Sequence, residues 1–599
     1  MLTMKRLLTD KSLKKSPSTA IHLAKTFYDS CLNIDRLNEL KAAPLHKIIT
    51  EIGGWNISEN STGRIWNEKG FNFEETLKKV HLKFRTSVFF SFDVDTDDKN
   101  SSRNIIKIDQ AGLGIERSYY LANRTDQNLV AYHNYMTTVG VLLGGERKHV
   151  EKQMMDVLIF EKELAKIFVA PDNRSQIDQV YRKMSIKDLS SISTKVPWLD
   201  FFSTAFTGIA AITESENVVV MAKDYLSKLA AVIKKANKTV LNNYMVWQVV
   251  SSKVSMLSAE FREAHEKLDK VLDGTSTVEE RWKTCIADTD ETVGMALGNL
   301  FVNDKFQGSS KEKATEMIDA IRAAFKKRLP LLDWMDDTTR KAAVAKADAI
   351  VDMIGFPDFI KDFKKLDEKY QGLDFSVTAE YATVICYCKE SKKPEERSYK
   401  RQVVDDSTNC ECLLQSIQKS NRYCNYGSIG GAVGHELVHA FDNSGRMYDK
   451  QGNYGVQWWT NKSIEGFQKK ADCLIEQYSK FNYNGEHVNG KYTLGENIAD
   501  NGGLKAAYSA YQNWVRENGP EKTLPVLKKT NDQLFFIAYG QSWCASIRPE
   551  KAKIMLDVDP HSPNKFRVLG TLSNLKEFSD AFKCPVGSKM NPKDKCVIW

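Results

Sequence analysis

The segment His435–His439, which reads H-E-L-V-H, constrains the fold of this chain more than any other. On a helix, residues four apart lie on the same face, so both imidazoles can reach one metal ion. Glu436 then projects to a position where its carboxylate can take a proton from metal-bound water. The flanking Val433 and Phe441 are apolar, which predicts a buried helix. The alternative is a pair of hydrogen-bonded interior histidines, but buried imidazoles and a carboxylate need partners, and zinc supplies one for both rings.

A zinc site of this type needs a third protein ligand and an open position for water. The best donor is the segment 495–503, which reads G-E-N-I-A-D-N-G-G. Glu496 and Asp500 are four residues apart, so a helix aligns them on one face. Taken alone, the pair is typical of a solvated acidic face. Beside two histidines, the pair predicts Glu496 as a zinc ligand and Asp500 as the acceptor of a histidine ring N–H.

These two segments together resemble the neprilysin and endothelin-converting enzyme family of zinc endopeptidases. The similarity runs over about residues 20 to 599, in the order that the family has. Further pieces that match the family are Gly53–Trp55, Gly355–Asp358, Phe535–Phe536, Gln541–Cys544, Asp559–Pro563, Phe566–Val568 and Cys596–Trp599.

The resemblance implies zinc ligands and a general base at positions that the motifs already suggested. His435, His439 and Glu496 match the ligands of one Zn²⁺ ion, and Glu436 matches the base. The mechanism implied is attack of zinc-bound water on a peptide carbonyl, with proton transfer through Glu436.

Three more residues acquire roles only through the resemblance, which also supports the role already given to Asp500. Asp500 and Asp442 match carboxylates behind the ligating histidines. His561 matches a residue that stabilises the oxyanion, and Arg567 matches one that holds a substrate carbonyl. Taken alone, His561 is typical of a turn between prolines and Arg567 of a protein surface.

The fold implied is mainly α, a two-lobed neprilysin-like metallopeptidase. A thermolysin-like zinc catalytic lobe and a helical lobe would enclose a central cavity. We expect a short basic segment at 1–20, a mainly helical domain at 21–380 and the zinc catalytic domain at 381–599. Apolar spacing of three and four residues predicts helices at 20–40, 129–144, 148–170, 218–236, 242–269 and 311–327, and weaker patterns predict strands at 87–94 and 105–109.

The chain has 11 cysteines, and the resemblance implies disulfides Cys31–Cys285 and Cys473–Cys596. The family pairs the counterparts of Cys544 and Cys584 with cysteines that follow a membrane anchor. No matching segment precedes residue 20, so one hypothesis is a chain without its natural N-terminus. The pairing of the remaining cysteines is left open; they are Cys386, Cys388, Cys410, Cys412 and Cys424.

Composition excludes several other classes of protein. Of the 599 residues, 42% are hydrophobic and 27% are charged, which is typical of a globular protein. The net charge of +8 is spread along the chain without a basic stripe, so nucleic acid is not an expected partner. The sequence contains no run of about 18 apolar residues, so it predicts no transmembrane helix. The first residues lack the apolar core of a signal peptide. Several Asn-x-Ser/Thr sites fit an extracellular or cell-surface glycoprotein, which the resemblance also implies.

The sequence departs from the family just before the zinc helix. There the family has an Asn-Ala-aromatic-Tyr strand that pairs with the bound peptide. That motif is absent from residues 399–425. The first interpretation is an endopeptidase that cuts oligopeptides before hydrophobic residues. The alternative is a catalytically impaired relative that binds zinc and peptides or a partner. An exopeptidase would need a site for a free peptide terminus, for which the sequence has no signature; the oligomeric state is left open.

Overall fold

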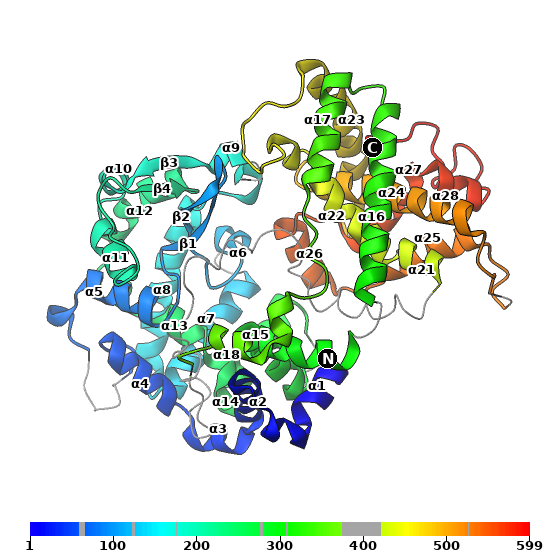
Figure 1. The fold of residues 1–599 in the computed structure, drawn as a ribbon. Coiled ribbons are helices and arrows are strands. Elements are labelled where there is room, and N and C mark those ends of the chain that lie inside the picture. The colour runs from blue at the N-terminus through cyan, green and yellow to red at the C-terminus, as the bar shows by residue number, and fades with distance from the viewer. Residues whose placement is uncertain are drawn as a thin grey trace. The chain divides into compact units, whose positions relative to one another are not determined.

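The computed structural model describes residues 1–58, 66–122, 126–174, 177–275, 279–306, 310–373, 421–524 and 526–599. The described residues are mainly helical and form two compact units (Figure 1). Unit 1 consists of Met1–Asp95, Asn104–Phe301 and Asp358–Tyr399. Unit 2 consists of Thr96–Arg103, Val302–Pro357 and Lys400–Trp599. The predicted mainly α, two-lobed fold is confirmed.

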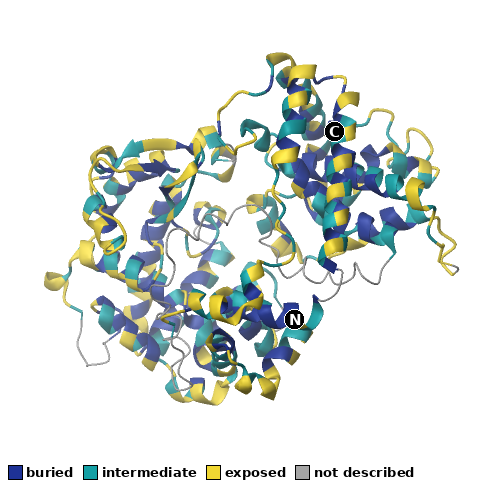
Figure 2. Ribbon diagram, viewed as in Figure 1, coloured by how far each residue is buried: buried dark blue, intermediate teal, exposed yellow. Residues whose placement is uncertain are grey.

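Helices form most of unit 1, and their apolar faces pack into its core (Figure 2). The longer ones are α2 (Thr19–Leu32), α4 (Ala43–Ile52), α7 (Gln127–Leu142), α8 (Arg147–Ile167), α12 (Lys223–Lys235), α13 (Lys238–Ser251), α14 (Ala259–Leu272) and α15 (Arg281–Lys305), whose end from Val302 belongs to unit 2. The shorter ones are α1 (Leu2–Thr9), α3 (Ile34–Leu40), α5 (Phe73–Lys78), α6 (Arg117–Leu121), α9 (Ile177–Val180), α10 (Ile186–Ile192), α11 (Trp198–Ala205) and α18 (Phe363–Lys369).

Most of a four-stranded sheet, of order β1-β2-β4-β3, also belongs to unit 1. Its strands are β1 (Phe90–Asp97), β2 (Asn100–Gln110), β3 (Arg182–Ser185) and β4 (Asn217–Val220). Strand β2 pairs with β4 in parallel, and β3 pairs with β4 antiparallel. The predicted helix at 218–236 is therefore wrong at its start. The fully buried β-branched run Val218–Val220 forms β4, and the helix begins only at Lys223.

Two other predicted helices are each split in two. The helix expected at 20–40 breaks at Asn33, whose side chain accepts the N–H of Arg36 and so begins α3. The helix expected at 242–269 ends at Ser251. The hydroxyls of Ser251 and Ser252 bond back to carbonyls of α13, and a short 3₁₀ turn precedes α14.

Unit 2 gathers its helices around one apolar core. They are α16 (Ser310–Arg328), α17 (Asp337–Ala349), α21 (Arg422–Gly427), α22 (Ile429–His439), α23 (Asn461–Ser479), α24 (Leu494–Asn518), α25 (Asn531–Ser542), α26 (Pro549–Val558), α27 (Asn564–Asn574) and α28 (Lys576–Ala581), with a short ribbon of β5 (Asn482–Tyr483) and β6 (Glu486–His487). The core joins α16 and α17 to the later helices. The boundary predicted at residue 380 lies outside the described residues and stays a prediction.

The two disulfides implied by the resemblance are present. Cys31–Cys285 joins α2 to α15, and Cys473–Cys596 joins α23 to the last residues of the chain. Among the described residues, Cys424, Cys544 and Cys584 are free thiols. The cysteines at 386, 388, 410 and 412 lie outside the described residues, as does most of the divergent segment 399–425. No helix in the described part is long and apolar enough to cross a membrane.

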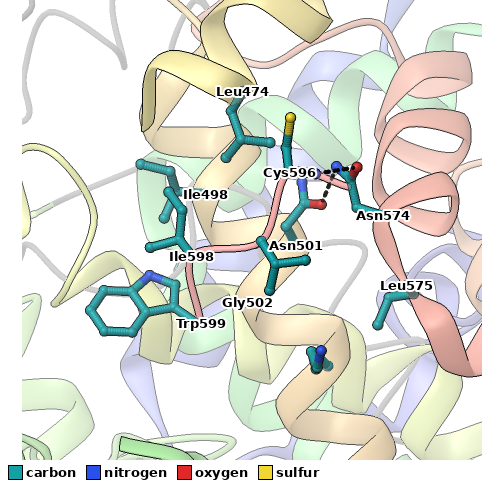
Figure 3. A pocket seen from close by; sticks show the side chains of 11 residues that line it. Leu474, Ile498, Asn501, Gly502, Asn574, Leu575, Cys596, Ile598 and Trp599 are labelled. Carbon is teal, nitrogen blue, oxygen red and sulfur yellow. Dashed lines mark hydrogen bonds between the residues drawn. The ribbon is translucent and has the colours of Figure 1, made fainter. Parts of the chain in front are cut away.

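The last residues of the chain pack against α24, around a small pocket (Figure 3). The N–H of Cys596 donates to Asn574, whose own amide donates to Asn501 on α24. Trp599 lies against Gly502, where a Cβ would meet the indole at 2.8 Å. These contacts fix the C-terminal segment against α24, the helix that carries Glu496.

Candidate metal centre

The two helices that carry the predicted ligands approach each other through glycines. A Cβ built on Gly434 of α22 would lie 2.3 Å from the carbonyl oxygen of Gly503 on α24. A Cβ on Gly503 would lie 2.2 Å from the backbone nitrogen of His435. Both distances are far below any real carbon contact, so only glycine permits this backbone-to-backbone approach. The contact brings His435 and Glu496 together.

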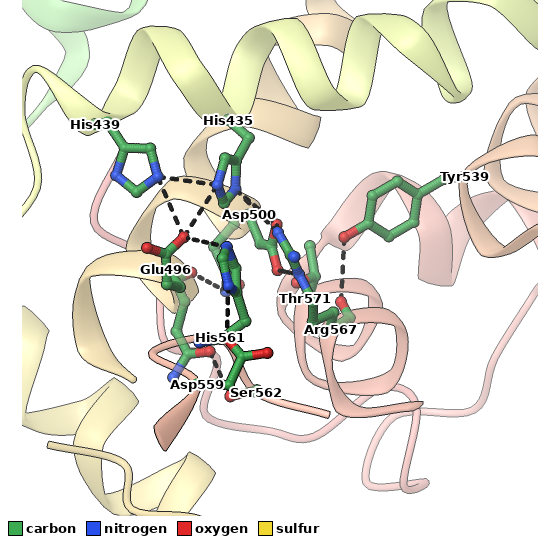
Figure 4. Close-up of polar contacts among 12 residues, drawn as sticks. His435, His439, Glu496, Asp500, Tyr539, Asp559, His561, Ser562, Arg567 and Thr571 are labelled. Carbon is green, nitrogen blue, oxygen red and sulfur yellow. Dashed lines mark hydrogen bonds and ion pairs between the residues drawn. The ribbon is translucent and has the colours of Figure 1, made fainter. Parts of the chain in front are cut away.

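The structure brings the three predicted zinc ligands to one point (Figure 4). The Nε2 atoms of His435 and His439 lie 3.1 and 3.2 Å from Oε2 of Glu496. The same two nitrogens are 2.9 Å apart. Behind them, Nδ1 of His435 contacts Asp500 at 2.8 Å, and Nδ1 of His439 contacts Asp442 at 2.7 Å.

The chemistry of these donors fits a divalent metal ion. Each Nδ1–H donates to a carboxylate, so each neutral imidazole turns the lone pair of its Nε2 toward the other. Two such lone pairs repel unless a proton or cation lies between them. Oε2 of Glu496 is buried, and among the described residues no donor makes a well-formed hydrogen bond to it. Two imidazole nitrogens and one carboxylate oxygen, with carboxylates behind the rings, are the ligand set of a catalytic zinc ion.

The electrostatics of the site favour positive charge at this point. Burial opposes a charge on His439, but Asp442 and Glu496 outweigh burial and raise its pKa to about 11. Burial likewise opposes a charge on Glu496, yet the facing imidazoles hold the pKa of its carboxyl far below the usual range. A metal ion would take the place of the protons that these shifts describe.

His561 lies at the same point and is fixed by its own carboxylate. Its Nε2 is 3.0 Å from Oε2 of Glu496, and its Nδ1 is 2.8 Å from Oδ1 of Asp559. Ligand atoms of His435, Glu496 and His561 all lie within 4.8 Å of one another. Burial opposes a charge on His561, but Asp559 and Glu496 raise its pKa to about 9.

Arg567 and Glu436 occupy different positions relative to this cluster. Arg567 is buried, and its Nε and Nη2 donate to the two oxygens of Asp500, each at 2.8 Å. Its guanidinium lies over the ring of Trp543, 3.7 Å from the centroid. Arg567 therefore fixes the carboxylate that holds His435, and its predicted contact with a substrate carbonyl stays a prediction. Glu436 is exposed on α22, next to His435, as expected of a group that is not a ligand.

Sequence reasoning missed two contacts at or beside His561. Asp559 takes the ring N–H, and its spacing of two residues from the histidine could have pointed to it. The hydroxyl of Ser562 donates to Asn497, which neighbours Glu496 on α24, at 2.8 Å. No local pattern indicates that second link, because the two residues are remote in sequence.

Comparison with known proteins places the chain in a family. Two sequence models of peptidase family M13 match it, one over residues 1–357 and the other over residues 417–598. Human endothelin-converting enzyme 1 is 43% identical over 611 residues, which cover 98% of this chain and 78% of that protein. Neprilysin-3 of Drosophila melanogaster is 39% identical over 629 residues, covering 99% and 79%.

Solved structures share the fold. The zinc metalloprotease Zmp1 of Mycobacterium tuberculosis, in complex with an inhibitor, matches with a TM-score of 0.80 at 23% identity, covering 100% of this chain and 93% of that one. PepO of Lactobacillus rhamnosis HN001 matches with a TM-score of 0.81 at 21% identity, covering 98% and 92%. The chain therefore belongs to peptidase family M13 and is a zinc metalloendopeptidase.

Proposed function

We propose that the chain hydrolyses oligopeptides at a single zinc ion held by His435, His439 and Glu496. The observation that carries the proposal is the convergence of both Nε2 atoms on Oε2 of Glu496, at 3.1 and 3.2 Å. A zinc ion bound there would supply a Lewis acid and a water of lowered pKa.

The side chains around the ligands supply the rest of the proposed mechanism. Glu436 takes a proton from the attacking water and passes it to the leaving amine. His561, oriented by Asp559, donates from Nε2 to the oxyanion that forms on the scissile carbonyl. Asp500 and Asp442 hold the two ligating rings in one orientation and tautomer.

Arg567 has two roles in this proposal. Its contacts with Asp500 steady the carboxylate behind His435, as the two 2.8 Å distances support. It also binds a backbone carbonyl of the substrate, a role suggested by its match to the family. A planar guanidinium held by a carboxylate and by the ring of Trp543 is preorganised for such a contact.

The proposed substrates are oligopeptides cut on the amino side of hydrophobic residues, outside the cell or at its surface. The relatives named endothelin-converting enzyme support a peptide substrate. The two disulfides support an oxidising compartment.

A second proposal is a catalytically impaired relative that keeps the metal and binds peptides or a partner. The missing Asn-Ala-aromatic-Tyr motif between residues 399 and 425 favours it. Without the residues of that motif, a bound peptide would lose partners for the main-chain hydrogen bonds of an added β-strand.

One experiment separates these two proposals. The protein and its Glu436→Gln variant are incubated with zinc and a quenched peptide library whose termini are blocked. The endopeptidase proposal predicts cleavage by the parent protein only, abolished by a chelator and restored by zinc. Mass spectrometry of the products should place hydrophobic residues directly after the cut bonds. Equal background cleavage by both proteins, with zinc still bound, would favour the impaired relative instead.

A further inference from the structure

Lys346 of α17 is buried beneath the loop that follows the zinc-binding helix. Only 7% of the residue is exposed. Its Nζ donates to the carbonyl oxygens of Ala440 and Gly445 at 2.7 Å, and to that of Tyr448 at 2.6 Å. An ammonium group has three N–H donors, and all three are used. The site is a cage of backbone carbonyls for one cation.

The N–H groups of the same loop point to Asp442. Its Oδ1 accepts the N–H of Ser444 at 2.7 Å and that of Gly445 at 2.6 Å. Its Oδ2 contacts Nδ1 of His439. A Cβ on Gly445 would lie 1.8 Å from the carbonyl oxygen of His439, so the loop doubles back onto the end of α22. One loop is thus tied by Lys346 through its carbonyls and by Asp442 through its N–H groups.

The ammonium stabilises this shape of the loop from the carbonyl side. With an apolar side chain at 346, these part-buried carbonyls would lose the three N–H donors of the ammonium, and a polar group that loses a partner away from water is costly. The loop would have to open toward water to solvate them. Opening would move Asp442 away from His439, because Asp442 lies in the loop whereas His439 is held at the end of helix α22.

We propose that Lys346 is a positioning residue for the metal centre. Its ammonium fixes the loop 440–448 so that Asp442 meets and orients the ring of His439. The inference rests on the proposed zinc ligation by His439. It also assigns a part in the metal centre to residues 302–357, which belong to unit 2 but match the N-terminal family model.

The test compares Lys346→Met with Lys341→Met in the full chain. Lys341 is an exposed lysine on the same helix, so its variant controls for loss of a charge on α17. Zinc affinity is measured by competition with a chromogenic chelator, and folding by circular dichroism and thermal unfolding. Neither measurement depends on peptide cleavage, so the result stands apart from the proposed activity. We expect Lys346→Met to raise the zinc dissociation constant about 10- to 100-fold, as for other groups that support metal ligands, and Lys341→Met to leave it unchanged.

A folded Lys346→Met protein with the parental zinc affinity would overturn the proposal. A double-mutant cycle tests the route through the loop. Once Asp442→Ala is present, Lys346→Met should weaken zinc binding by less than about threefold; fully additive losses would contradict the proposal. If Lys346→Met does not fold, Lys346→Arg decides. Arginine keeps the charge but cannot reproduce three convergent donations from one nitrogen, so a folded protein should bind zinc more weakly, and parental affinity would assign Lys346 to folding alone.

Discussion

Replacing Gly434 by alanine should disturb the candidate metal centre from a position that supplies no ligand. The added Cβ would lie 2.3 Å from the carbonyl oxygen of Gly503, whereas ordinary contacts begin at 3.4 Å. Helices α22 and α24 must therefore separate by about 1 Å. Metal–ligand distances tolerate only about 0.2 Å, so the proposed ligands His435 and Glu496 could no longer bind one ion in good geometry. Overpacking of this kind costs about 1–3 kcal/mol of folding free energy.

Gly430→Ala is the matched control. Gly430 is also a buried glycine of α22, but a Cβ there would have its nearest neighbours at 3.5 Å, an ordinary contact. Alanine at a helical position without a clash stabilises by about 0.5–1 kcal/mol. The two variants therefore make the same chemical change with opposite expected effects on stability.

The assay combines thermal unfolding without zinc and titration with zinc against a competing chelator. We expect Gly434→Ala to unfold several degrees below Gly430→Ala, since about 1 kcal/mol shifts the Tm of a unit this size by about 2–4 °C. We also expect its zinc dissociation constant to rise at least about tenfold. Parental zinc affinity in Gly434→Ala, together with a Tm no lower than that of the control, would refute the argument from helix contact.

Three further predictions concern other parts of the chain. Ser562→Ala removes the hydroxyl that donates to Asn497, a contact directly beside His561. We expect steady-state kinetics to show kcat lowered about tenfold or more, and zinc titration to show unchanged affinity. An unchanged kcat would count against a role for the Ser562–Asn497 hydrogen bond in catalysis. Glu161 accepts hydrogen bonds from Tyr120 and Gln248, and burial raises the pKa of its carboxyl above the ordinary value of 4.5. The protonated carboxyl therefore stabilises the fold fully below pH 4.5, and this stabilisation is lost as the pH rises through the raised pKa. Glu161→Gln should flatten that part of a plot of Tm against pH, and an unaltered slope would assign it to other groups. Zinc at 100 times its dissociation constant should stabilise the metal-free protein by about 2.7 kcal/mol, visible as a rise in Tm; no rise would exclude binding to the folded state.

Spacing along the sequence predicted the pairs of site residues that lie on one helix. A separation of four residues aligns His435 with His439, and Glu496 with Asp500, on any helix, and the structure has both pairs on helices. The close contact between those helices depends on Gly434 meeting Gly503. The motif contains those glycines, but nothing local to either one shows that they face each other.

The remaining features depend on contacts between distant segments. Periodicity merged Val218–Val220 with the following helix, because a buried apolar run looks alike in a strand and in a helix until its partner strand is known. Lys346 was unremarkable in sequence, because its role comes from carbonyls about 100 residues further on.

The discontinuity of unit 2 has a consequence for chimeras between relatives of this family. An exchange made at residue 380 would bring in a foreign loop 440–448 while keeping the host's own α16 and α17. The incoming loop would then fold around the host's Lys346, and the incoming C-terminal residues would pack against a host core that includes Trp334, whose indole donates to the carbonyl of Ile598. A graft that also carries residues 302–357 transfers the loop with its cation and its core. Crossover points at 302 and 357, in addition to one at residue 400, are therefore needed to move the loop together with Lys346 and its helix.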